Sequence, residues 1–284
     1  MEINKKTCII ISGPTAVGKT SYGIELALKY NTQVISADSR QCFKELNIGV
    51  AKPSREELEK VPHYFINSHS IHDEVDAKVF ENYALKTAGK LFENRDTVIM
   101  VGGTGLYIKA FTDGLDDIPE ADENIRREID AQYKIYGFDW LHDEIKKHDP
   151  DFFLNGEMQN PRRMLRALEV KLSTGKSIFD FHSGKNAKRD FEIKNIFLGL
   201  PRQELYDNIN HRVDVMMEKG LLDEAKGLFP LRHLNALQTV GYKELFHYFE
   251  GKISLEKAVD EIKKNTRHYA KRQMTWFKKR NEGR

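Results

Sequence analysis

Short, continuous apolar runs alternate with longer amphipathic stretches through about the first 110 residues of the chain. The runs Cys8–Ile11, Gln33–Ala37 and Thr97–Val101 predict buried strands, because parallel strands covered on both faces are apolar throughout. The stretch Ser21–Tyr30 has the spacing of a helix, and a further strand is expected at Ile193–Leu200. The pattern therefore predicts an α/β fold with a three-layer core around a parallel sheet.

The middle of the chain has a different character, with helical spacing, many charges and few β-branched clusters between Ile118 and Lys176. Helices are expected at Asn124–Tyr136, Asp139–Lys147 and Arg162–Ser173, the last ending at Gly175. We expect residues 115–190 to form a helical insertion domain within a core made of residues 1–114 and 191–284. A polar connector is expected at Phe181–Arg189, a helix from Pro201 through Leu222, and a long terminal helix at Leu255–Lys279.

Composition restricts the class of protein. The chain has 284 residues, of which 40% are apolar and 31% charged, which is typical of a globular protein. No run approaches the roughly 18 apolar residues of a membrane helix, and the polar segment Met1–Thr7 does not resemble a secretory signal. Cys8 and Cys42 are the only cysteines, too few for a disulfide framework or a cysteine-rich zinc site. We expect a cytoplasmic protein that does not contact a membrane.

The first strand leads directly into a phosphate-binding pattern. The eight residues fit G-x-x-x-x-G-K-[ST] and are Gly13, Pro14, Thr15, Ala16, Val17, Gly18, Lys19 and Thr20. Backbone N–H groups and the helix N-terminus would surround a phosphate, Lys19 would add a charge, and the Thr20 hydroxyl would hold Mg²⁺. The alternative is a glycine turn with no ligand, which the strand before and the helix after the pattern disfavour.

This pattern is typical of nucleotide-binding and ATP-binding proteins, yet it establishes a phosphate or diphosphate site and not ATP hydrolysis. A hydrolytic P-loop enzyme also needs a carboxylate at the end of a neighbouring strand. The run Thr97–Val101 ends in Gly102-Gly-Thr-Gly105 with no acid, whereas the run before it ends in Asp38. One acid beside a phosphate cradle favours group transfer over a hydrolytic motor.

Charge is distributed unevenly. The net charge is only +2, but residues 262–281 contain eight Lys or Arg and no Asp or Glu. Tyr269, Trp276 and Phe277 are interleaved among them, and such a basic stripe indicates contact with a phosphate backbone. Trp276 and Phe277 could equally anchor the helix in the core, and we expect this of at least one.

Several blocks together resemble the tRNA dimethylallyltransferase (tRNA isopentenyltransferase) family. Besides the P-loop they are Ser36-Ala-Asp-Ser-Arg-Gln41, Ile48-Gly-Val-Ala-Lys-Pro53, Val101-Gly-Gly-Thr-Gly-Leu-Tyr107, Pro161-Arg-Arg-Met-Leu-Arg-Ala-Leu-Glu169, Val240-Gly-Tyr-Lys-Glu244 and Ala270-Lys-Arg-Gln-Met-Thr-Trp276. The resemblance implies transfer of a dimethylallyl group from dimethylallyl diphosphate to the N6 amine of the adenosine 3′ of a tRNA anticodon. It also implies Mg²⁺ as cofactor, the tRNA anticodon stem-loop as partner, and action as a monomer.

The resemblance implies three catalytic residues, which are Asp38, Thr104 and Arg212. Asp38 would orient the amine and take its proton, with Mg²⁺ binding or helix capping as the alternatives. Thr104 would lie near the diphosphate and the amine, although a turn-capping hydroxyl is the simpler interpretation of its glycine turn. Arg212 would reach the diphosphate, and a solvated helix arginine is the alternative.

A larger set of residues is implied to contact tRNA. Its members are Ser39, Arg40, Gln41, Arg126, Arg162, Arg163, Arg166, Lys243, Lys271, Arg272, Gln273, Trp276 and Lys278. Arg162 and Arg166 share one helix face by their spacing, and Gln41 could hold a base edge. The simpler interpretation of the charged members is a solvated helix face.

Three other functions remain open at this point. A P-loop kinase of a nucleoside or small metabolite would share the core, and an adenylate prenyltransferase would share the catalytic residues. A non-catalytic RNA-binding protein would not need Asp38 and Thr104 at converging strand ends. The segments His63–Asn67 and Phe43–Asn47 depart from the family pattern, which affects substrate preference more than reaction class.

Overall fold

The computed structural model describes residues 5–282, so most of the polar N-terminal segment lies outside the described residues. The chain forms two compact units, one reaching Gly114 and resuming at Ala187, the other spanning Leu115–Asn186. The chain thus returns to the first unit at Ala187, slightly before the expected position 191.

The first unit is built on a five-stranded sheet in the order β3-β2-β4-β1-β5, and all its strand pairs are parallel. The strands are β1 (Thr7–Ser12), β2 (Val34–Ala37), β3 (His63–Tyr64), β4 (Thr97–Gly102) and β5 (Glu192–Phe197). The predicted α/β class and parallel sheet are confirmed. β3 was not predicted, because two residues are too short to show a periodic pattern.

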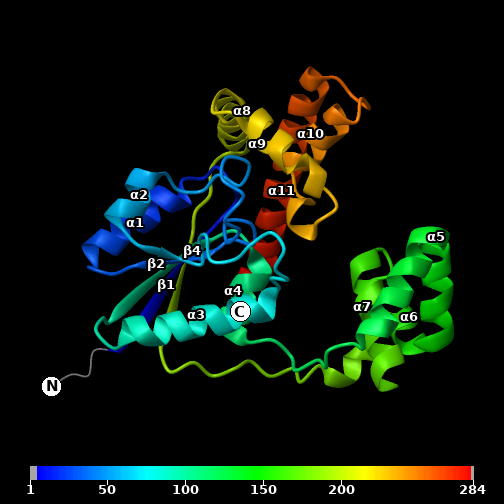
Figure 1. Cartoon of the computed structure of the whole chain (residues 1–284). Helices are drawn as coiled ribbons and strands as arrows, with labels where there is room; N and C mark the ends of the chain where they lie inside the picture. Colours follow the sequence, from blue (N-terminus) through cyan, green and yellow to red (C-terminus); the bar gives the residue numbers. More distant parts are fainter. Residues whose placement is uncertain (1–4, 283–284) are drawn as a thin grey trace. The chain divides into compact units, whose positions relative to one another are not determined.

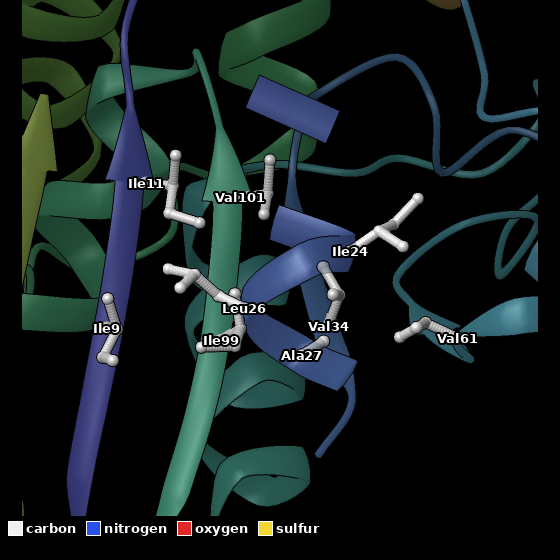
Figure 2. Close-up of a cluster of buried hydrophobic side chains, with 9 residues drawn as sticks. All are labelled: Ile9, Ile11, Ile24, Leu26, Ala27, Val34, Val61, Ile99 and Val101. Atoms are coloured by element: carbon white, nitrogen blue, oxygen red, sulfur yellow. The ribbon is translucent and has the colours of Figure 1, made fainter. Parts of the chain in front are cut away.

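Helices cover both faces of this sheet (Figure 1). Alternate strand residues point to opposite faces, and one set forms a cluster with helix α1 (Lys19–Lys29). Figure 2 shows this cluster, which comprises Ile9, Ile11, Ile24, Leu26, Ala27, Val34, Val61, Ile99 and Val101. Helix α3 (Ala77–Phe92) packs against β2 and β4 on the other face, where Ile10, Ile35 and Met100 are fully buried.

The remaining helices of this unit are α2 (Arg55–Lys60), α4 (Gly105–Asp113), α8 (Arg202–Glu218), α9 (Leu221–Leu228), α10 (Tyr242–Phe249) and α11 (Leu255–Glu282). Short 3₁₀ turns lie at Phe229–Leu231 and Asn235–Leu237. The prediction of one helix through Leu222 was wrong, because Gly220 has φ 96° and separates α8 from α9. The terminal helix was predicted correctly, and it packs against α4, α8 and α10.

The second unit consists of α5 (Glu123–His148), α6 (Pro150–Asn155), α7 (Pro161–Thr174) and a 3₁₀ turn at Ile178–Phe181. Gly137, with φ 74° and ψ −155°, interrupts α5 close to where two separate helices were expected. Gly175 ends α7 in the left-handed conformation, as its sequence position predicted. Leu141, Ile145 and Met164 belong to a separate apolar core. None of the helices in the described part of the chain combines the length and apolar character needed to cross a bilayer.

Candidate active site

The P-loop connects β1 to α1, and two of its glycines occupy positions that disfavour any larger residue. A Cβ on Gly13 would lie 2.4 Å from the carbonyl oxygen of Leu198, and Gly18 caps α1 with φ 89°. Lys19 Nζ donates to the Pro14 carbonyl over 2.6 Å. Burial lowers the pKa of Lys19 to about 8, against the opposing effect of the Asp38 charge. The loop therefore holds a half-buried ammonium group that can pair with an anion.

Arg212 lies on α8 and reaches the P-loop, where its guanidinium donates to Thr15 Oγ1 over 3.3 Å. Burial lowers its pKa and the Asp38 charge opposes the shift, but a guanidinium remains protonated. The solvated-arginine alternative is wrong, because this side chain is part of the same cation cluster as Lys19. Only the tertiary fold brings these two distant positions together.

Asp38 and Thr104 meet because β2 and β4 are neighbours that end at the same edge of the sheet. Thr104 N donates to the Ala37 carbonyl over 3.2 Å, and Thr104 Oγ1 accepts from Ser39 N over 3.1 Å. Asp38 Oδ1 accepts from the backbone of Arg40 (2.8 Å) and of Gln41 (3.2 Å). The hydroxyl of Thr104 makes no capping bond to its own helix, α4, so the local turn-capping interpretation is wrong.

Tyr269 also belongs to this group, and it was not predicted as a site residue. It lines the same cavity as Asp38, and desolvation and then the Asp38 charge raise the pKa of its hydroxyl to about 12. The guanidinium of Arg272 lies 5.8 Å from its ring centroid. One signal in the sequence pointed to this residue, namely an aromatic side chain among the basic residues of the terminal helix.

Gln273 does not have the exposed position that a tRNA contact requires, and the prediction for this residue is wrong. Its Oε1 accepts from Thr15 N over 2.9 Å, and its Nε2 donates to the Gly103 carbonyl over 3.0 Å. The residue is only 6% exposed. Gln273 therefore ties the terminal helix to the P-loop and to the glycine turn after β4.

The side-chain amide of Gln41 is also hydrogen-bonded within the protein. Its Nε2 donates to the carbonyls of Val50 (3.3 Å) and Ala51 (3.0 Å), and its Oε1 accepts from Ser36 Oγ over 3.2 Å. A contact with a base edge would require these bonds to be exchanged, and that role of Gln41 stays a prediction. Ser39 is half-buried beside Thr104, and the Arg40 side chain donates to the Asn235 carbonyl over 3.3 Å.

The terminal helix separates into two faces. Phe277 is buried, which confirms that at least one aromatic residue is a core anchor. Trp276 is half-buried, and its indole lies so close to Gly105 that a Cβ there would be 2.1 Å from Nε1. Lys271, Arg272 and Lys278 are exposed, as is Lys243 on α10. The exposed cations remain predicted RNA contacts, whereas Trp276 packs on the start of α4.

The insertion arginines are partly neutralised within their own unit. Arg126 and Arg166 both lie near the buried Glu169 carboxylate, at 3.6 and 3.5 Å, and Arg163 pairs with Glu157. Arg162 is exposed near the start of α7. Arg126 thus links α5 to α7, whereas Arg166 pairs within α7, and the tRNA contacts of both stay a prediction.

Many of the site residues of the first unit line one cavity of about 900 Å³, although Thr104 is not among them. Its lining includes the P-loop from Thr15, Asp38, Arg212, Tyr269 and the segment Asn47–Pro53. Within the described residues, no group of three His, Cys, Asp or Glu side chains could enclose a metal ion. A hydroxyl, a carboxylate and a phosphate cradle in one cavity suit Mg²⁺ bound mainly through phosphate and water.

Comparison with known proteins identifies the family. Residues 41–280 match the family described as IPP transferase. The chain belongs to this family. It is 49% identical over 273 residues to a tRNA dimethylallyltransferase of Christiangramia forsetii, an alignment that covers 95% of this chain and 90% of that protein.

Solved structures of the family agree with this fold. A tRNA isopentenylpyrophosphate transferase of Bacillus halodurans is 40% identical with a TM-score of 0.69, over 96% of this chain and 87% of that one. A eukaryotic dimethylallyltransferase, crystallised while acting on tRNA, is 28% identical with a TM-score of 0.79, over 95% of this chain and 69% of that one. Family membership disfavours the kinase and the non-catalytic alternatives.

Proposed function

We propose that this protein transfers a dimethylallyl group from dimethylallyl diphosphate to the N6 amine of the adenosine 3′ of a tRNA anticodon. One observation carries the proposal, namely that Asp38 and Thr104 follow neighbouring strands beside a P-loop at which two half-buried cations, Lys19 and Arg212, converge. The Christiangramia forsetii relative is described as a tRNA dimethylallyltransferase, and the assignment of reacting groups in this chain is our proposal.

The donor diphosphate would lie on the P-loop. Backbone N–H groups at the start of α1, Lys19 and Arg212 would bind its oxygens and stabilise the charge that grows as it leaves. The Thr20 hydroxyl would hold Mg²⁺, with Asp38 lining the same cavity. When bound, Mg²⁺ supplies further positive charge to the leaving diphosphate.

The acceptor amine would lie against Asp38 and Thr104. The bond from N6 to the allylic carbon forms as the bond from that carbon to the diphosphate oxygen breaks. The nitrogen loses one proton, and Asp38 is placed to accept it. Asp38 need not be a strong base, because the amine becomes acidic only as its new bond forms. Thr104, whose hydroxyl accepts from Ser39 N, would orient the amine.

RNA binding is assigned to the exposed cations Lys271, Arg272, Lys278 and Lys243, and to the arginines of the insertion. An adenosine in a loop can leave its stack without breaking a duplex, so the cost of presenting its amine is low. We propose that the enzyme works on cytoplasmic tRNA and as a monomer, which light scattering of the purified protein would check.

The deciding experiment incubates the protein and Mg²⁺ with labelled dimethylallyl diphosphate and one acceptor at a time. We expect label in an anticodon stem-loop RNA, none in AMP and no requirement for ATP. Label in AMP alone would indicate an adenylate prenyltransferase. Steady ATP turnover without label transfer would move the assignment to a kinase.

A further inference from the structure

The segment Ile48–Lys52 has no regular secondary structure, yet it lines the same cavity as the P-loop. Its backbone polar groups are bonded to the protein. The N–H groups of Ile48 and Gly49 donate to the Glu224 carboxylate over 2.9 and 3.0 Å. The Val50 and Ala51 carbonyls accept from the amide of Gln41, as described above. The segment is therefore held in place by side chains from distant parts of the chain.

Glu224 is in turn held by Tyr242, the residue at the start of α10. The Tyr242 hydroxyl donates to Glu224 Oε1 over 2.6 Å, and burial together with this bond raises the pKa of the tyrosine, so it remains a donor. The ring is fully buried against the segment, because a Cβ on Gly49 would lie 2.6 Å from Tyr242 Cζ. Glu224, Tyr242 and Gly49 together are called the latch below.

The sequence block around Tyr242 serves this contact. Gly241 has φ 102°, a conformation that favours glycine, and its N–H donates to Glu244 Oε2 over 2.8 Å. Glu244 also accepts from Asn265 on α11 over 2.8 Å. The start of α10 is thus fixed to the terminal helix, and Tyr242 is delivered to the latch in one orientation.

A second contact holds the far end of the segment. Lys52 Nζ donates to the Phe43 carbonyl over 2.6 Å and to Asn67 Oδ1 over 2.5 Å. Because the polar groups of the segment are used in these ways, Ile48, Val50 and Ala51 contribute half-exposed apolar surface to the cavity. Apolar surface in the cavity that contains the phosphate cradle suits the hydrocarbon part of an allylic diphosphate.

We propose that Glu224 and Tyr242 are positioning residues that fix the Ile48–Lys52 wall, and that this wall limits the length of the allylic chain that the cavity accepts. The inference rests on the proposed donor. The latch residues would touch no substrate, and they would act only through the position of the wall. Loosening the latch should therefore relax the selection of the donor without affecting the phosphate cradle.

Donor binding tests this directly. Calorimetry on the full chain with Mg²⁺ would compare inorganic diphosphate, dimethylallyl diphosphate and the longer geranyl diphosphate. The variants are Tyr242→Phe, which removes only the hydroxyl, and Gly49→Ala, which forces the wall away from the ring. Tyr248→Phe removes a half-buried hydroxyl from the same helix and is the matched control.

We expect wild type and Tyr248→Phe to prefer dimethylallyl over geranyl diphosphate. Tyr242→Phe should reduce that preference by about tenfold, the effect of losing one hydrogen bond to a charged group. Gly49→Ala should also reduce it, and the affinity for inorganic diphosphate should stay unchanged in every variant. An unchanged preference in both latch variants, or a parallel loss for all three ligands, would overturn the inference. A wild type that binds dimethylallyl diphosphate no better than inorganic diphosphate would instead count against the proposed donor.

Discussion

At the residue scale, the two oxygens of the Asp38 carboxylate have different surroundings. Oδ1 accepts from two backbone N–H groups, which fixes the orientation of the side chain. Within the described residues, Oδ2 makes no such bond, so we propose it as the oxygen that accepts a proton from substrate. Fixing one oxygen and leaving the other for chemistry is what a positioned base requires.

Replacing this group tests its role. Asp38→Asn keeps an oxygen for the two backbone N–H groups but cannot take a proton. We expect turnover with RNA and donor to fall by about two to four orders of magnitude, the usual contribution of a positioned base. RNA affinity should change little, because phosphate contacts dominate it. Single-turnover assays with labelled donor measure the first effect, and near-normal turnover would exclude Asp38 as the proton acceptor.

The lowered pKa of Lys19 leads to a second prediction. Below about pH 8 the Lys19 ammonium group of the free protein is charged, and above that pH it becomes neutral. An ordinary lysine, whose pKa is 10.5, would stay charged to a pH more than two units higher. Since a diphosphate binds the charged form better, donor affinity should fall as pH rises above about 8, by up to about tenfold per unit. Lys19→Arg should flatten this dependence, because a guanidinium remains charged. Titrations by calorimetry that stay level from neutral pH to about pH 10 would contradict the prediction.

At the scale of elements, α11 has two separate tasks. Its buried face carries Gln273 and Phe277 and fixes the P-loop and β4 turn, while its exposed face carries Lys271 and Arg272. Nearer the start of the basic stripe, Lys263 is already paired with Asp214 over 2.6 Å, and Arg267 with Asn210 over 2.6 Å. The cations suited to an RNA backbone are therefore concentrated in the C-terminal part of the helix.

Charge reversal at Lys271 and Arg272 separates the two tasks. The double variant with Lys271→Glu and Arg272→Glu should have a higher KM for RNA and a smaller change in saturated turnover. The reason is that these residues would bind the RNA equally in the ground state and in the transition state. The salt dependence of RNA affinity should decrease by about one unit of log–log slope for each lost phosphate contact. Donor affinity should remain as in wild type. Parallel salt plots for the two proteins would show that the stripe is only solvated surface.

At the scale of the whole molecule, the insertion leaves and re-enters the first unit at neighbouring points. Ala187 N donates to the Asp113 carbonyl over 2.6 Å, and Arg189, in the segment that leads into β5, pairs with Glu81 over 3.0 Å. The second unit has its own apolar core. The first unit therefore has no structural need for the insertion to close its fold.

Excision tests this independence. Replacing residues 115–186 with a short Gly-Ser linker should give a folded protein that binds dimethylallyl diphosphate like the full chain, because all cavity-lining residues lie in the first unit. RNA affinity should drop, since the predicted insertion contacts are removed. Circular dichroism, donor calorimetry and RNA binding measure the three properties. Equal RNA affinity with and without the insertion would remove Arg126, Arg162, Arg163 and Arg166 from the RNA interface.

Several features were determined by the sequence itself. The apolar runs of β1, β2 and β4 and the P-loop glycines encode local geometry, so the parallel sheet and the phosphate site could be predicted from short segments. Asp38 could be predicted as well, because strand order in a parallel sheet brings strand ends to one edge. The helix stop at Gly175 is equally local, since only a left-handed residue is needed there.

Other features depended on contacts between distant segments. Gln273 looked like an RNA contact because its neighbours are basic, but the packing of α11 turned it toward Thr15 and Gly103, 258 and 170 residues away. The side-chain amide of Gln41 likewise donates to the carbonyls of Val50 and Ala51. Which side of a helix is buried, and which partner satisfies a buried amide, are decided by tertiary packing, because the sequence spacing is compatible with either face until the neighbouring elements are in place.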